Sequence, residues 1–186
     1  MTNPAVDLAV LERGYRTTAA VLAAMPADRW DAPTPCTEWT VREVADHLVE
    51  ALDFFAATVT GARQTTLETT PVEDRAAAYR ATADRCLAAF GRPGVLTAEH
   101  PFPGRPLSGA VIANISLSES LVHGWDLTTA AGLPYAPDPD VVAAVLAYNE
   151  NSGGPVIDGL FADPVPVPAG APPLVTLLGK LGREVR

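Results

Sequence analysis

Three ionisable residues in the second half of the chain have the spacing of a single helix face. Glu119, His123 and Asp126 lie at positions i, i+4 and i+7 of a stretch that the apolar periodicity predicts to be helical. They share that face with Ile112 and Ile115, so the same face carries both apolar and ionisable side chains. Burial of ionisable groups is costly unless partners satisfy them. A divalent cation is the most economical partner for a carboxylate and an imidazole four residues apart.

A third metal ligand must come from another helix, and His47 is the best candidate. Of the three histidines, His100 lies in a proline-rich segment, whereas His47 flanks the apolar stripe of a second predicted helix. Two histidines and one glutamate with an open fourth position are a pattern used by catalytic zinc. The alternative is a plain hydrogen-bonded pair of Glu119 and His123 without metal, since this spacing is common on helix faces.

Apolar residues at three- and four-residue steps predict the helices that would position these groups. Thr40 with Glu43, and Thr70 with Glu73, have capping-box spacing. The predicted helices run from Asn3-Pro4 to Pro26, from Thr40 to Gly61, from Thr70 to Gly91, from Ser108 to Gly132, from Asp138-Pro139 toward Gly153, and over 174–181.

The segments between these helices are rich in proline and glycine. We expect residues 92–106 to form an irregular crossover with one extended piece near Val95 to Thr97, and residues 154–173 to wrap the surface. Strand patterns are almost absent. The sequence therefore predicts an all-α fold, a bundle of four main helices with a long crossover and a short C-terminal helical extension, as one domain over residues 1–186.

The composition excludes several classes of partner. The 186 residues include 13 Lys and Arg against 22 Asp and Glu, a formal net charge of −9. Nucleic acids and anionic membranes need clustered basic residues, so we expect neither as a partner. The N-terminus lacks the pattern of a signal peptide, and Cys36 and Cys86 are too few for a disulfide scaffold. We expect a cytoplasmic protein with Cys86 in its core.

Two motifs carry a family resemblance. One is Thr34-Pro35-Cys36-Thr37-Glu38-Trp39-Thr40-Val41, which leads into His47; the other is Glu119 followed by Val122-His123-Gly124-Trp125-Asp126-Leu127. They resemble the metal-binding domain of mycothiol-dependent maleylpyruvate isomerases, within the DinB-like superfamily. The tail, from Val165-Pro166-Val167-Pro168 to Leu181-Gly182-Arg183, is similar to the end of a compact actinobacterial branch of that group.

The resemblance implies a DinB-like four-helix bundle with a metal between its helices. The ligands of the family fall on His47, Glu119 and His123, the residues that the spacing also selects. Zn²⁺ is favoured, although His and Glu also accept Ni²⁺, Mn²⁺ or Fe²⁺. A thiol cofactor, mycothiol in actinobacteria, would approach the open position and act as a thiolate. DinB-like bundles often dimerise, so the resemblance allows a homodimer, although the sequence itself does not fix the oligomeric state.

Several roles stay open at the level of sequence. Asp126 would orient a ligand histidine, cap a neighbouring helix, or close the metal site as a fourth ligand. Cys36 is either packed or a reactive thiol near a helix start. Trp39 and Trp125 flank the two motifs, and we expect both to pack against the site. Three arginines are available to bind the thiol cofactor: Arg80, Arg85 and Arg105.

The leading functional hypothesis is a metal-dependent enzyme that uses a low-molecular-weight thiol for transfer, isomerisation or ring opening of a small electrophilic metabolite. The isomerases carry a further α/β domain after the part that is similar here, so the resemblance does not fix the substrate. One alternative is a non-catalytic metal-binding bundle with a structural or sequestering role. Another is a hydrolase in which zinc-bound water attacks the substrate.

Overall fold

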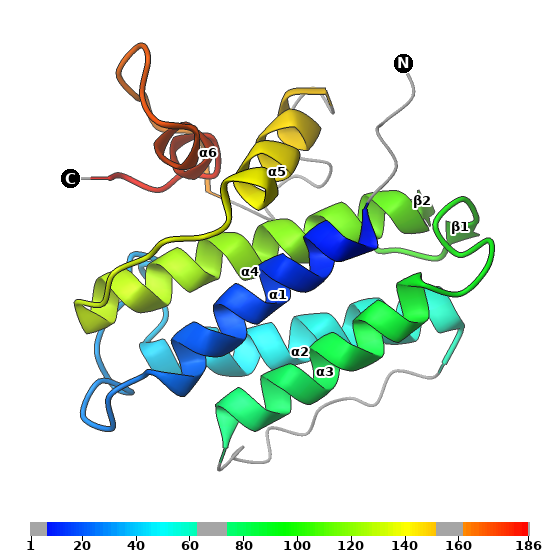
Figure 1. The fold of residues 1–186 in the computed structure, drawn as a ribbon, viewed down its shortest axis with the longest axis horizontal. Helices are drawn as coiled ribbons and strands as arrows, with labels where there is room; N and C mark the ends of the chain where they lie inside the picture. Colours follow the sequence, from blue (N-terminus) through cyan, green and yellow to red (C-terminus); the bar gives the residue numbers. More distant parts are fainter. Residues whose placement is uncertain (1–6, 63–73, 152–161, 186) are drawn as a thin grey trace.

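The computed structural model describes residues 7–62, 74–151 and 162–185. Within these ranges the regular secondary structure is helical apart from one small antiparallel sheet, and the predicted all-α class is confirmed (Figure 1). The elements are α1 (Leu8–Ala23), α2 (Val41–Thr60), α3 (Arg75–Phe90), β1 (Glu99–His100), β2 (Leu107–Ser108), α4 (Gly109–Ala131), α5 (Pro139–Asn151) and α6 (Pro173–Lys180).

The ends of α2 and α4 lie where the sequence predicts them. Thr40 accepts a hydrogen bond from the backbone of Glu43, and the Glu43 side chain accepts from the backbone of Thr40, which completes the capping box. Ser108 caps α4 in the same way through the backbone NH of Val111. Both helices end at a glycine in the left-handed region, with φ of 69° at Gly61 and 68° at Gly132.

The other two long helices have aspartate caps. Asp7 accepts from the backbone NH of Ala9 at the start of α1, and Asp74 accepts from that of Ala77 at the start of α3. The predicted start signals of these helices, Asn3-Pro4 and residues 70–73, lie outside the described residues. So do Gly153, the expected end of the fifth helix, and residues 154–161 of the predicted wrap.

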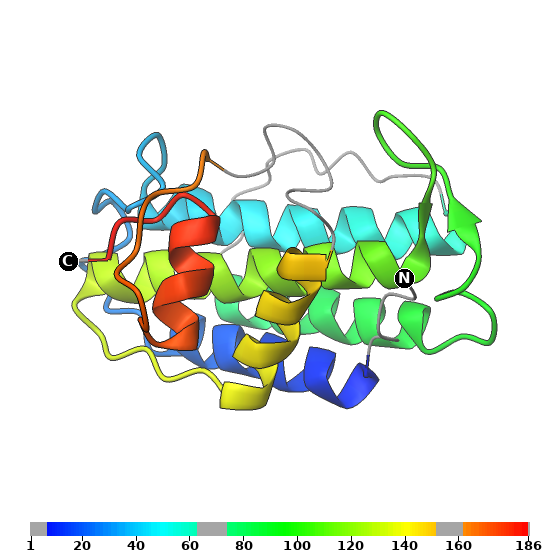
Figure 2. The same ribbon diagram turned by 90° about the horizontal axis from the view of Figure 1, so that it is seen from above.

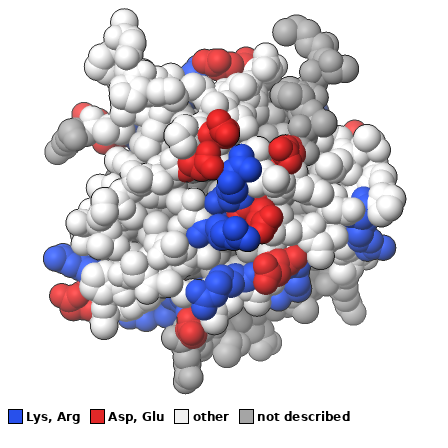
Figure 3. Space-filling model, viewed as in Figure 1, with Lys and Arg blue, Asp and Glu red and all other residues white. Residues whose placement is uncertain are grey.

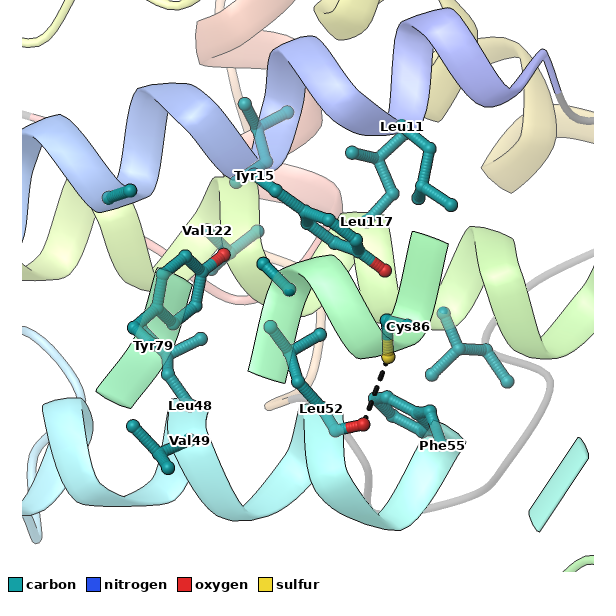
Figure 4. Packing of buried hydrophobic residues seen from close by; sticks show 14 of the residues in the cluster. Leu11, Tyr15, Leu48, Val49, Leu52, Phe55, Tyr79, Cys86, Leu117 and Val122 are labelled. Carbon is teal, nitrogen blue, oxygen red and sulfur yellow. Dashed lines mark hydrogen bonds between the residues drawn. The ribbon is translucent and has the colours of Figure 1, made fainter. Parts of the chain in front are cut away.

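Helices α1 to α4 pack side by side into a four-helix bundle. α2 lies against α3 and α4, and α1 lies against the same two helices. The predicted apolar stripe of α2 is buried throughout, and Cys86 of α3 is fully buried in the core as expected, where its thiol donates to the backbone oxygen of Leu52 (Figure 4). Burial of these stripes is the main stabilising contribution to the bundle.

Helices α5 and α6 form an outer layer on the bundle. α5 packs on α1, α4 and α6, and both short helices lie across α4 when the molecule is seen from above (Figure 2). Residues 162–172, which include a turn at Ala169-Gly170, lead into α6, and the backbone NH of Val165 donates to the oxygen of Gly179. The chain end after α6 runs to the same end of the bundle as the loop between α1 and α2 (Figures 1 and 2).

The predicted extended piece at Val95 to Thr97 is wrong. Pro93 and Gly94 form a turn there instead, with φ of 80° at Gly94, and the backbone NH of Thr97 donates to the oxygen of Gly94. The strands of the crossover are β1 and β2, which pair Glu99 with Ser108. Local turn chemistry therefore decides the conformation where the apolar pattern suggested a strand.

Candidate metal centre

The structure brings His47, Glu119 and His123 together. Glu119 and His123 are one turn apart on α4, and His47 reaches them from the first half of α2. Oε2 of Glu119 is 3.0 Å from Nε2 of His47 and 3.3 Å from Nε2 of His123. The potential ligand atoms of all three residues lie within 4.8 Å of one another.

The three side chains differ in their access to solvent. Helix α4 is buried on most of its surface, and Glu119 and His123 are only 3% and 4% exposed. The side chain of His47, in the first half of α2, is 31% exposed. The cluster is therefore built into the core but reaches solvent on the His47 side.

The electrostatics of the cluster are those of a buried ion pair. Burial disfavours the charged form of Glu119, but hydrogen bonds from His123 and His47 outweigh it and lower the pKa of Glu119 to about 2. Burial likewise acts against the charged form of His123, but its hydrogen bonds to Asp126 and Glu119 raise the pKa of His123 to about 8. Without a metal, the site is therefore held together by a proton on His123.

Asp126 lies on the opposite side of the His123 ring from Glu119. Its Oδ2 accepts from Nδ1 of His123 at 2.9 Å, and the residue has no exposed surface. A proton fixed on Nδ1 leaves Nε2 as the atom that faces Glu119 and His47. Of the three roles considered for Asp126, the geometry is that of a residue orienting the histidine.

Arg183 completes this arrangement, and sequence reasoning missed it. It follows α6 in the chain, is 6% exposed, and its Nη2 is 2.9 Å from Oδ2 of Asp126. No local spacing could have revealed the pair, since the two residues are 57 positions apart. The one available signal was Gly182, which with φ of 80° turns the chain back toward the bundle after α6.

The arginines considered as thiol-binding groups are placed elsewhere. Arg85 forms an ion pair with Asp53 at 2.7 Å, on the α2–α3 side of the bundle. Arg80 is an exposed residue of α3, and Arg105 is exposed in the loop between β1 and β2. The ring of His100 has a different partner, because its Nε2 forms a hydrogen bond with the backbone oxygen of Val95.

Two residues of the first motif line the cluster. The ring of Trp39 lies 4.6 Å from that of His47 and 6.0 Å from that of His123, measured between centroids. The Cys36 thiol lies within 4.8 Å of a His123 nitrogen and an Asp126 oxygen. Burial raises the pKa of Cys36, and the charge of Arg183 opposes that effect. Trp125, in contrast, is partly buried against the hydrophobic core.

The donor set fits a divalent metal ion. The Glu119 Oε2 atom lies 3.0 and 3.3 Å from the two imidazole nitrogens, and all three potential ligand atoms lie within 4.8 Å of one another. Ligand atoms about 2.1 Å from a tetrahedral zinc ion stand at a similar separation from each other. The anionic carboxylate and the oriented imidazole would hold such an ion, with Asp126 on the far side of the ring rather than among the three donors.

On the face shown in Figure 3, basic and acidic side chains are interspersed, and neither sign forms a broad patch. No helix in the described ranges combines the length and the apolar character needed to cross a membrane.

Comparison with known proteins gives a family but no characterised relative. The family model for the mycothiol maleylpyruvate isomerase N-terminal domain matches residues 11–128, which include the three clustered residues and Asp126 but not Arg183. Two uncharacterized proteins of Mycobacterium tuberculosis, one from strain CDC 1551 and one from strain H37Rv, are each 32% identical over 187 residues, with 94% of this chain and 96% of the relative covered. No solved structure matches the chain.

Proposed function

Because the chain belongs to the family of mycothiol maleylpyruvate isomerase N-terminal domains, we propose that it is a divalent-metal-dependent enzyme acting with a low-molecular-weight thiol of the mycothiol type. The reaction is transfer or isomerisation of a small electrophilic metabolite in the cytoplasm. His47, Glu119 and His123 are the proposed metal ligands. Zn²⁺ is the first choice of ion for two imidazoles and one carboxylate, ahead of Ni²⁺, Mn²⁺ and Fe²⁺.

The observation that supports this proposal most strongly is the convergence of the three donors in a largely buried cluster. Two histidines share one oxygen of a glutamate that is 3% exposed. A purely structural ion pair needs one histidine, whereas a metal needs several donors around one point. The cost of burying these groups is offset when a cation replaces the proton on His123.

The chain's own residues have distinct tasks in this function. Asp126 holds the proton of His123 on Nδ1 and so keeps Nε2 directed at the cluster. The ring of Trp39 packs against that of His47. A divalent metal bound here would supply a Lewis acid that favours the thiolate form of an incoming thiol. The partial exposure of His47 gives the thiol a route to the ion.

Spectroscopy of the Co²⁺-substituted protein tests the thiol part of the proposal. Addition of mycothiol should produce a sulfur-to-metal charge-transfer band, because the three protein donors leave a coordination position free. The same protein is then incubated with mycothiol and a panel of electrophiles. We expect turnover that requires added thiol.

The two alternatives give different results in that experiment. Turnover without thiol would indicate the metal-water hydrolase. An unchanged Co²⁺ spectrum and no turnover would indicate the non-catalytic metal-binding bundle. In that case Asp126→Ala would show whether a fourth side chain closes the site.

A further inference from the structure

The buried pair of Arg183 and Asp126 joins the end of the chain to the candidate metal centre. Arg183 lies beyond residues 11–128, the part matched by the family model, whereas Asp126 lies within it. A buried guanidinium is costly unless its donors are satisfied. Here Nη2 and Nε contact the Asp126 carboxylate at 2.9 and 3.4 Å, and Nη1 donates to the backbone oxygen of Leu181 at 2.8 Å.

The backbone after α6 is built to deliver this side chain. The NH of Arg183 donates to the oxygen of Leu178, and the NH of Gly182 to that of Gly179, which ends the helix in a tight turn. Gly182 has a φ of 80°, and a Cβ atom there would lie 2.5 Å from the Cβ of Ala162. Only glycine fits this turn, so the direction of the chain at Arg183 is fixed.

Asp126 is the shared acceptor between Arg183 and the cluster. Its Oδ2 lies 2.9 Å from Nδ1 of His123 and 2.9 Å from Nη2 of Arg183, and the residue is fully buried. Without the guanidinium, this carboxylate would keep only His123 as a side-chain partner and would no longer be held in place. This change removes the fixed acceptor from His123 Nδ1.

We propose that Arg183 is a positioning residue of the metal centre, which holds Asp126 as the acceptor that fixes the tautomer and orientation of His123. The segment after the family domain thereby completes a site whose donors all lie within that domain. The inference deepens the proposed function and rests on it for the metal-binding readout. The second readout uses the metal-free protein. A failure of the positioning role of Arg183 can therefore be distinguished from a failure of the proposed metal-dependent function.

The first test is metal affinity, measured by chelator competition with Co²⁺ on the full chain. We expect Arg183→Met to weaken binding about 10-fold or more, the range found when hydrogen-bond partners of metal ligands are removed. Asp126→Asn should weaken it similarly, and the double variant should bind within about twofold of Asp126→Asn alone, because both changes act on one interaction.

A matched control separates positioning from general stability. Arg75 is also buried, and it forms the same kind of fork with Asp46, at 2.7 and 2.9 Å, between α3 and α2. Arg75→Met removes a pair of the same geometry away from His123, with a buried arginine and an Asp46 side chain that is 33% exposed. We expect its metal affinity to stay within about twofold of the unmodified protein.

The second test is ¹⁵N NMR of the His123 ring in metal-free protein, in alkaline buffer where the ring is neutral. The unmodified protein and Arg75→Met should show the Nδ1–H tautomer alone, and Arg183→Met a mixture. If Arg183→Met does not fold, Arg183→Lys replaces it, with an expected affinity loss of about threefold because the planar fork is lost. An unchanged tautomer would overturn the proposal, as would equal affinity losses in the Arg75 and Arg183 variants.

Discussion

His47 and Glu119 are 72 positions apart in the sequence, yet Nε2 of His47 lies 3.0 Å from Oε2 of Glu119. This contact joins α2 to α4 inside the bundle and places a second imidazole beside the Glu119–His123 pair. With His47, the Glu119–His123 pair, which is a common arrangement on a helix face, becomes part of a set of three potential metal donors.

Replacement of His47 by Ala should remove tight metal binding and leave the bundle folded. His47 supplies one of three proposed donors, and its side chain is already 31% exposed, so little packing is lost. Metal content and circular dichroism measure the two effects. His100→Ala is the control, because His100 pairs with the backbone of Val95. Unchanged metal content in His47→Ala would remove His47 from the ligand set.

Metal affinity should rise with pH up to about 8. In the metal-free protein His123 keeps its proton up to a pKa of about 8. A ligating imidazole must lose that proton, so affinity should increase by about tenfold per pH unit below this value and level off above it. Chelator competition at a series of pH values measures the slope. A flat profile between about pH 6 and 8 would show that His123 releases no proton on binding.

The thermal stability of the metal-free protein should depend on pH in a different way from the metal affinity. The raised pKa of His123 contributes stability that is complete below its ordinary value of 6.5 and lost as pH rises through about 8. The lowered pKa of Glu119 contributes stability that is complete above 4.5 and lost as pH falls toward about 2. We therefore expect the highest Tm between these two limits, at about pH 5 to 6. A Tm that keeps rising through pH 8 in metal-free buffer would contradict this ion pair.

The sequence predicts the local parts of this site better than the distant ones. The Thr40 capping box and the Glu119–His123 pair depend on residues three or four positions apart, so helix periodicity reveals them. His47 was reached by elimination among three histidines, and the structure places it beside Glu119. The contact of Arg183 with Asp126 depends on how α6 docks, which no local pattern encodes.

The wrong prediction of a strand in the crossover has a local origin instead. Val95 to Thr97 has the side chains of a strand, but the turn at Pro93-Gly94 determines its backbone. Strand pairing occurs further along, where Glu99 meets Ser108 at the start of α4. The partner of a strand, rather than its own sequence, decides whether it forms.

The two cysteines should differ sharply in reactivity. Burial raises the pKa of Cys86 to about 12, and its thiol donates to the backbone oxygen of Leu52. Cys36 is only partly buried. Iodoacetamide should therefore modify Cys36 slowly in the native protein and Cys86 only after unfolding, as mass spectrometry of Cys36→Ser and Cys86→Ser variants would show. Labelling of native Cys86 at the rate of Cys36 would contradict the packing around α3.

The N-cap of α2 should contribute measurably to stability. Thr40→Ala removes the hydroxyl that accepts from Glu43 and should lower the free energy of unfolding by about 1 kcal/mol. Thr17→Ala, in the middle of α1, is the matched control and should cost less, because its hydroxyl bonds only to the backbone oxygen of Arg13. Urea unfolding measures both. Equal losses would show that the cap is not what fixes the start of α2.

Elemental analysis of untagged protein, purified from metal-replete medium, tests the metal centre most directly. His47, Glu119 and His123 form one of two groups of potential metal ligands among the described residues, and the other group, Cys36, His123 and Asp126, shares His123 with it. Because one histidine is common to both groups, we expect about one equivalent of one divalent metal per chain, Zn²⁺ first. The Glu119→Gln variant, which keeps the shape of the side chain without its charge, should lose most of that metal. A metal content well below one equivalent in the unmodified protein would contradict the assignment of the site and, with it, the proposed metal- and thiol-dependent function.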